Sequence, residues 1–203
     1  MLGEEKPCIY PIISMAMKKS IFFATALLGA WMLHSCGNRQ NPQHEKPEDS
    51  ANALNETMRK VDDTSSAFAV DAADRNMMEI QLGKLAQEKA ANPRVKAFAT
   101  MMVEEHTKAN DQLKTIASRK GIVLPTELST ASKNFIDKWS QKKVERFDKE
   151  YIREMVDHHD QDVKDFDNAA NNLQDETLKE WARKMLPVLI VHQDSARAIS
   201  ESL

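Results

Sequence analysis

The sequence predicts an all-α fold, a four-helix bundle of two antiparallel hairpins joined by one crossover connection. Apolar residues recur at helical spacing in four long stretches, and alternating β-branched runs are absent. Only two of the five glycines, Gly83 and Gly121, follow residue 37, which also favours helices over turn-rich folds. With 203 residues, of which 41% are hydrophobic and 29% charged, the chain can bury a core beneath a charged surface. The bundle domain is expected over residues 64–203.

The first hairpin is predicted around Asn92-Pro93, after a first helix capped within residues 64–66. Asn is a good N-cap and Pro suits the first position of a helix, so a second helix is expected to begin at this pair. Residues at equal distances from such a turn lie at the same height in two antiparallel helices. The stripe before the turn comprises Phe68, Ala72, Glu79, Leu82, Ala86 and Ala90, and the stripe after it comprises Val95, Phe98, Met102, His106, Leu113 and Ala117.

A longer connection is predicted between the two hairpins. Gly121 suits a helix C-cap, and Pro125 prevents the helix from continuing. A short helical piece is expected to start at Ser129 or Thr130. Whether residues 141–145 break or bend the chain after that piece stays open, because no Gly or Pro separates it from the next helix.

The second hairpin is predicted around Asp175. A long amphipathic stretch runs from residue 144 to residue 173, and a last helix begins near Asp175 with Pro187 expected to kink it. The first of these stripes comprises Phe147, Tyr151, Met155, His158, Phe166, Ala169 and Leu173, and the second comprises Leu178, Trp181, Met185, Leu189, His192, Ala196 and Ile199.

Each long helix thus carries one ionisable residue on an otherwise apolar stripe. Glu79 and His106 lie 13 and 14 residues from Asn92, while His158 and His192 each lie 17 residues from Asp175. Residues at matched heights can converge in a bundle core, where metal sites are commonly built, and imidazoles with a carboxylate suit zinc, iron or copper. The predicted ligands are Glu79, His106, His158 and His192, with Glu105, Glu154, His159 and Gln193 as supporting or alternative residues.

Two alternatives to a non-enzymatic, metal-binding core stay open. A buried His paired with a Glu or a tyrosine hydroxyl can be a hydrogen-bonded group that only fixes helix register. A metal-dependent oxidoreductase is the other alternative. Against di-iron chemistry, no Glu stands three residues before His106, His158 or His192, whereas the usual di-iron pattern requires Glu-x-x-His on two helices.

The N-terminal region predicts export and a lipid anchor. Residues 17–36 combine two lysines, a short apolar segment and Leu33-His34-Ser35-Cys36, which resembles a bacterial lipobox. This resemblance implies cleavage before Cys36 and lipidation of that residue, and several acyl chains on one residue anchor a protein stably. An ordinary signal peptide with a chance cysteine, or a single N-terminal anchor helix, is the alternative. Residues 1–16 have no assigned role and are consistent with a start-site error. Residues 37–63 are polar and are expected to form a flexible linker.

Charge and cysteine content narrow the function further. The formal net charge of −3 argues against a general nucleic-acid binder, so no nucleic-acid partner is expected. Cys8 and Cys36 both precede the helical region, so neither is expected to serve redox chemistry in the core.

Several segments together resemble the bacterial domain-of-unknown-function family 4142. They are Val95 to Ala99 with Met102, His106, Asn110 and Leu113, then Phe147-Asp148 with Tyr151, Met155 and His158 or His159, and finally Leu186-Pro187 with His192. The resemblance covers roughly residues 64–202. It implies an exported protein with a ferritin-like four-helix arrangement. Members of the family are often labelled predicted outer membrane proteins. It implies no established activity.

The sequence therefore predicts a lipid-anchored protein of the cell envelope, at the outer membrane and facing the periplasm. Its leading function is non-enzymatic, with a polar core that binds a metal or small ligand. A metal-dependent oxidoreductase and a purely structural or partner-binding bundle are the alternatives. No protein partner can be named from the sequence.

Overall fold

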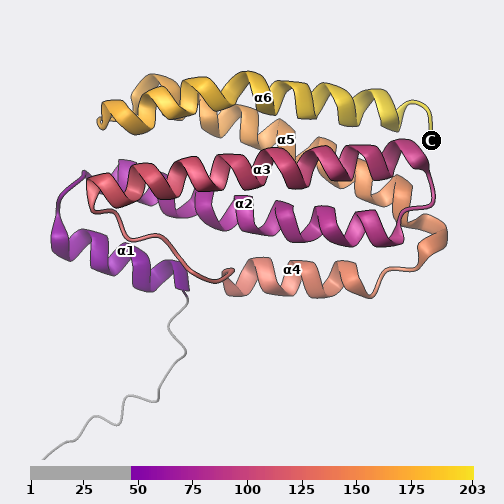
Figure 1. Cartoon of the computed structure of the whole chain (residues 1–203), viewed down its shortest axis with the longest axis horizontal. Coiled ribbons are helices and arrows are strands. Elements are labelled where there is room, and N and C mark those ends of the chain that lie inside the picture. Colours follow the sequence, from indigo (N-terminus) through magenta and orange to yellow (C-terminus); the bar gives the residue numbers. More distant parts are fainter. Residues whose placement is uncertain (1–46) are drawn as a thin grey trace, which may run out of the picture. The chain divides into compact units, whose positions relative to one another are not determined.

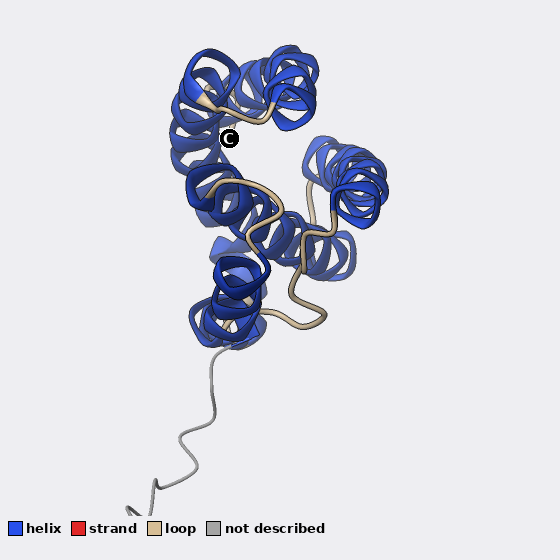
Figure 2. Ribbon diagram, turned by 90° about the vertical axis from the view of Figure 1, so that its left-hand side faces the viewer, coloured by secondary structure: helices blue, strands red, loops and turns tan. Residues whose placement is uncertain are grey.

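The computed structural model describes residues 47–203, which contain six α-helices, one short 3₁₀ helix and no strand (Figure 2). The predicted segments 1–16 and 17–36, with Cys36, lie outside the described residues. None of the helices described is both long and apolar enough to cross a membrane. The elements are α1 (Pro47–Met58), α2 (Asp63–Lys89), α3 (Pro93–Lys120), α4 (Thr130–Ser140), η1 (Val144–Arg146), α5 (Phe147–Asn172) and α6 (Glu176–Ser200).

The four long helices pair as the sequence predicts. Helices α2 and α3 pack along each other as one antiparallel hairpin, and α5 and α6 form the other (Figure 1). The hairpins meet where α3 lies against α6 and α2 lies against α5. The connection between them carries α4, which packs on α2. The all-α class is therefore confirmed.

Local sequence signals set most of the helix ends. The Asn92 side chain accepts a hydrogen bond from the backbone N–H of Arg94, and Pro93 occupies the first turn of α3. Gly121 ends α3 with φ 70°, a left-handed conformation that favours glycine. Ser129 and Asp175 cap α4 and α6 as expected. Helix α2 instead starts earlier than predicted, because Asp62 caps it.

Gly83 lets the two helices of the first hairpin approach closely. A Cβ atom at this position would lie 2.8 Å from Cγ2 of Val103 and 3.2 Å from the backbone oxygen of Ala99. Both distances are shorter than an ordinary van der Waals contact between such atoms. The absence of a side chain therefore sets the spacing of α2 and α3 at this position.

Part of the predicted linker is helical. Residues 47–58 form α1, which packs against α2, and the side chain of Asn55 is buried. The Asn55 amide donates to the backbone oxygen of Val123 and accepts from the Val123 N–H, at 2.9 Å and 2.7 Å. This pair of long-range hydrogen bonds fastens α1 to the loop after α3. A polar composition alone did not reveal it, because the partner lies 68 residues away.

The region around residues 141–145 is a break between helices. Helix α4 ends at Ser140, and η1 precedes the first turn of α5. Two contacts brace the break against the first hairpin, since the Lys89 ammonium donates to the backbone oxygen of Lys142, and Asp148 accepts from the backbone N–H of Asn92. The start of α5 is thereby fixed beside the turn between α2 and α3.

The core consists of two apolar clusters at opposite ends of the long helices. One contains Leu113, Phe166 and Trp181, and the other contains Phe98 and Trp139. Buried polar side chains separate the two clusters along every long helix. We call this set the polar layer; it comprises Asn76, Glu79, His106, Asn110, His159, Asp162 and His192.

Candidate metal centre

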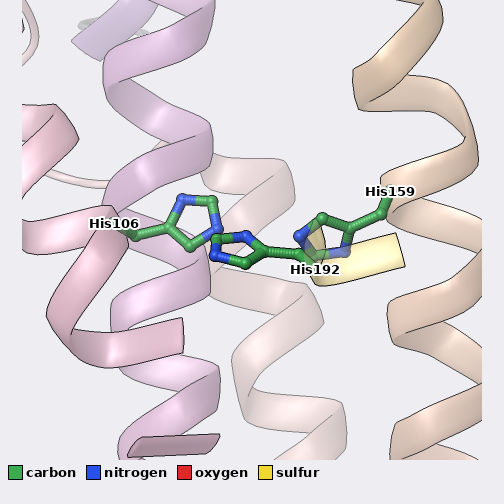
Figure 3. Close-up of side chains that lie close together, drawn as sticks. All are labelled: His106, His159 and His192. Carbon is green, nitrogen blue, oxygen red and sulfur yellow. The ribbon is translucent and has the colours of Figure 1, made fainter. Parts of the chain in front are cut away.

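Three histidines of the polar layer point toward one another. His106 comes from α3, His159 from α5 and His192 from α6, and all three are buried (Figure 3). One nitrogen of each lies within 4.8 Å of the others. The ring centroids are 5.2 to 5.9 Å apart. We call these residues the three-His cluster.

Hydrogen bonds fix the orientation of two of the rings. The Nδ1 atom of His159 lies 2.8 Å from the backbone oxygen of Met155, and Nδ1 of His106 lies 2.9 Å from Oδ1 of Asn76. Both partners are acceptors, so each Nδ1 must carry the proton. The Nε2 atoms of His106 and His159 then hold a free lone pair. Metal-binding histidines are commonly oriented in this way by a bond at the other nitrogen.

Each ring of the three-His cluster has at least one nitrogen without a hydrogen-bond partner in the described residues. Nε2 of His106, Nε2 of His159 and both nitrogens of His192 are buried and unpartnered in the described part of the chain. Leaving a buried polar atom unpaired costs about 1–3 kcal/mol. A metal ion would satisfy one nitrogen from each ring. This convergence of free lone pairs distinguishes the three-His cluster from an ordinary hydrogen-bonded pair in a core.

The electrostatics of the layer keep His106 and His192 neutral at neutral pH. Burial lowers the pKa of His106 to about 4. Burial and the neighbouring imidazoles lower the pKa of His192 to about 3. Imidazoles bind metals in the neutral form, so both rings are ready to act as ligands at neutral pH without first losing a proton.

Glu79 places a negative charge beside the cluster. Its side chain is fully buried, and Oε1 accepts a hydrogen bond from Nδ1 of His158 at 2.8 Å. Burial alone would raise the pKa of Glu79, but the His158 hydrogen bond and the nearby imidazoles lower it to about 2. The other oxygen, Oε2, is buried and has no hydrogen-bond partner within residues 47–203. An ionised carboxylate with one free oxygen therefore lies within electrostatic reach of His106, His159 and His192.

The histidine that α5 contributes to the cluster is not the one that the sequence analysis predicted. His158 was predicted to join Glu79, His106 and His192, but its side chain is 24% exposed and His159 occupies the cluster. Adjacent residues on a helix point about 100° apart, so only one of the two can face the core squarely. His158 turns toward α4 instead, where its ring lies 5.2 Å from that of Phe135.

The remaining predicted residues lie outside the cluster. Glu105 forms an ion pair with Lys108, and Glu154 lies 3.4 Å from Nε2 of His158. Gln193 donates a hydrogen bond to Asp160. These three side chains are partly exposed or face neighbouring surface groups. They do not converge with the three-His cluster.

Sequence reasoning missed two buried groups of the layer, Asn76 and Asp162. Asn76 lies three residues before Glu79, which places it on the same face of α2, and it orients His106. Asp162 is 1% exposed and pairs with Arg75 on α2. Burial raises the pKa of Asp162, although Arg75 opposes the shift. Asn76 lies three residues before Glu79 and Asp162 lies three residues after His159, and this helical spacing was the signal that could have identified both.

The donor set fits a transition metal. In a tetrahedral site with bonds of 2.0–2.1 Å, ligand nitrogens lie about 3.4 Å apart. The three nitrogens lie within 4.8 Å of one another, so they would have to close by at most about 1.4 Å. Three imidazoles leave a further coordination position, which a water molecule can fill. Three protein ligands and an open position are the arrangement of exchangeable or catalytic sites rather than closed structural ones.

Comparison with known proteins supports the fold and the family. The family described as "Domain of unknown function (DUF4142)" matches residues 49–199, which confirms the resemblance seen in the sequence. The crystal structure of a DUF305 fragment from Deinococcus radiodurans is similar, with a TM-score of 0.62 and 14% sequence identity. The similarity covers 70% of this chain and 99% of that fragment, and at this identity it bears on the fold alone. No curated protein matches the chain.

Proposed function

We propose that this chain, which belongs to the DUF4142 family, is a metal-binding protein whose three-His cluster holds one first-row transition metal ion. The observation that carries the proposal is the meeting of three buried, unpartnered ring nitrogens from three different helices. A core histidine with a structural role would pair both of its nitrogens. Here the free lone pairs face one another.

The ligand chemistry favours zinc, iron or copper. Neutral imidazole is a good ligand for each of these metals, whereas magnesium and calcium prefer oxygen ligands. His106, His159 and His192 would supply three nitrogens, and Glu79 would supply charge compensation. Asn76 and the backbone oxygen of Met155 would hold two of the rings in place.

We propose metal binding without turnover as the leading role. The cluster lies between two apolar clusters, and each of its three side chains is buried. A metal-dependent oxidoreductase is the second candidate, and the open coordination position of a three-imidazole site favours it. Consumption of oxygen or peroxide by the metal-loaded protein, lost in His192→Ala, would support the oxidoreductase over the binding role.

The setting that we propose is the cell envelope. The helical domain would be a ferritin-like four-helix bundle, tethered through lipid on Cys36 to the outer membrane and facing the periplasm. The lipobox-like Leu33 to Cys36 sequence supports this anchor. Metabolic labelling with an alkyne fatty acid tests it: the full chain should be labelled and Cys36→Ala should not. Equal labelling of both would contradict the anchor at Cys36.

Elemental analysis of the full-length chain, purified in detergent, tests the metal proposal. After loading and desalting, about one metal ion per chain is expected, as for a single site of this kind. His106→Ala, His159→Ala and His192→Ala should each lose it. His158→Gln is the matched control, because it alters the neighbouring imidazole while keeping a donor for Glu79. Metal-free protein with unchanged stability after chelation would support a purely structural bundle instead.

A further inference from the structure

A surface pocket lies directly outside the buried carboxylate of the proposed centre. It has a volume of about 400 Å³ and lies between α2, α4 and α5. Among its lining residues is His158, the imidazole that donates to Glu79. The full lining comprises Asp71, Asp74, Arg75, Met78, Ser132, Asp157, His158 and Gln161.

The pocket is strongly acidic at its mouth. Asp71, Asp74 and Asp157 line it, and the neighbouring groove between α2 and α5 adds Asp63 and Asp165. Arg75 is the one Lys or Arg in the two linings, and its charge is already paired with Asp162 and Asp165. A cleft lined by one sign of charge concentrates ions of the opposite sign and accelerates their arrival. This surface therefore attracts cations.

His158 separates the pocket from the centre. Its side chain is 24% exposed, while Glu79 behind it has no exposure. Nδ1 of His158 donates to Oε1 of Glu79, and Oε2 is buried without a hydrogen-bond partner in the described residues. A single imidazole, hydrogen-bonded to the carboxylate that it covers, thus stands between the acidic pocket and a free carboxylate oxygen.

We propose that this acidic pocket is the route by which a hydrated divalent metal ion enters the protein, and that His158 is its gate. Rotation of His158 away from Glu79 exposes the carboxylate, which receives the ion from the pocket and passes it to the three-His cluster. The inference rests on the proposed metal-binding function and adds the route to it. His158 acts here as a positioning residue, since it moves to admit the ion and is not one of the three proposed nitrogen ligands.

The other pockets lack this combination. The pocket between α3 and α6 is lined by Glu176, Glu180 and Lys184, so its charge is mixed. The pocket lined by α2, α4 and the loop before α4 contains Lys84 and Lys133 beside Glu127. Among the pockets found in residues 47–203, the one beside His158 joins a carboxylate-lined mouth to an imidazole in contact with the polar layer.

The rate of Co²⁺ uptake by the metal-free full chain tests the gate. Stopped-flow absorbance reports binding, and competition with a chelator reports release. His158→Ala should speed both uptake and release several-fold, because the covering side chain is gone. His158→Gln should stay close to the unmodified protein, because glutamine can still cover Glu79 and donate to it. Unchanged rates in His158→Ala would overturn the gate.

The acidic mouth is tested by charge removal at two exposed positions. Asp71→Asn with Asp157→Asn should slow Co²⁺ uptake by about three- to tenfold at low ionic strength, and the difference should shrink as salt is added. The matched control, Glu104→Gln with Asp111→Asn, removes two exposed carboxylates from α3, away from the pocket. Equal rates for the two double variants would overturn the route.

These outcomes separate the two proposals. If the unmodified protein binds Co²⁺ and the His158 and aspartate variants behave as their controls do, only the entry route is wrong. If the unmodified protein binds no Co²⁺, the metal-binding function itself is wrong.

Discussion

Nδ1 of His158 lies 2.8 Å from Oε1 of the fully buried Glu79, which makes a partly exposed imidazole the hydrogen-bond partner of the only glutamate in the polar layer. The bond joins α5 to α2 across the interface between the two hairpins. It helps to keep the carboxylate of Glu79 ionised although the side chain is buried. The charge of this carboxylate and the neutrality of His106 and His192 together define the electrostatics of the proposed centre.

The first prediction concerns the ionisation of His158. Burial favours its neutral form, but the hydrogen bond and charge of Glu79 outweigh burial and raise the pKa of His158. Glu79→Gln removes the charge while leaving an oxygen to accept the bond, so the pKa of His158 should fall. Histidine NMR titration measures the shift. A pKa that is unchanged in Glu79→Gln would show that the carboxylate does not control His158.

The second prediction concerns acid stability of the metal-free protein. His106 and His192 have folded pKa values of about 4 and about 3, below the ordinary value of 6.5. As the pH falls below 6.5, the unfolded chain takes up protons that the folded chain does not, so folding stability falls. The loss should reach about 1.4 kcal/mol per pH unit for each imidazole, and it ends near each folded pKa. Glu79 adds to the loss between pH 4.5 and about 2.

Urea unfolding between pH 7 and pH 4.5 measures this loss. His192→Phe replaces one neutral buried ring with another that cannot take up a proton, so its stability should fall less steeply over the same range. His158→Gln should change the slope in the opposite direction. The raised pKa of His158 contributes stability that is present at low pH and lost as the pH rises through that pKa, so without it stability should fall more steeply on acidification. Identical slopes for His192→Phe and the unmodified protein would contradict the buried neutral state of His192.

The third prediction concerns the attachment of α1. Asn55→Ala removes both hydrogen bonds to Val123 and leaves its partly buried backbone groups without these partners. The expected cost is about 1–3 kcal/mol, with faster amide hydrogen exchange confined to residues 47–58 and the loop after α3. Glu56→Ala, one residue along on the exposed face of α1, should leave exchange unchanged. Equal exchange in the two variants would show that Asn55 does not hold α1.

The sequence predicted those parts of the fold that depend on local chemistry. Asn92-Pro93, Gly121 and Asp175 mark helix ends because capping and left-handed turns need particular residues at single positions. The four long helices could also be predicted, because the spacing of apolar residues along one helix is a local signal too. Helix α1 was missed because Asn55 is held by Val123, a partner distant in the sequence, and a contact of this kind cannot be predicted from local composition.

The choice between His158 and His159 shows where sequence reasoning stopped. Both residues lie close to the apolar stripe of α5, and the helical spacing of the apolar residues is compatible with either one facing the core. The four-residue spacing of Tyr151, Met155 and His159 favours the latter, but packing decides it: α4 lies beside His158, whereas α6 brings His192 to His159. Glu79, His106 and His192 could be placed in one layer from the sequence because two symmetric hairpins fix their heights.

The fourth prediction concerns stabilisation by metal. A ligand that binds only the folded state at 100 times its dissociation constant stabilises it by about 2.7 kcal/mol. Zinc should therefore raise the melting temperature of the metal-free protein, and a chelator should reverse the change. His159→Ala should melt at the same temperature with and without zinc. A zinc response that survives in this variant would place the ion elsewhere.

X-ray absorption fine structure of the zinc-loaded full-length protein tests the metal centre most directly. The account predicts three imidazole nitrogens about 2.0–2.1 Å from the ion, with one further oxygen. The same measurement on His106→Ala should show the loss of an imidazole or of the bound ion. A first shell composed of oxygen alone, or a signal with three imidazoles that is unchanged in His106→Ala, would contradict a metal held by His106, His159 and His192.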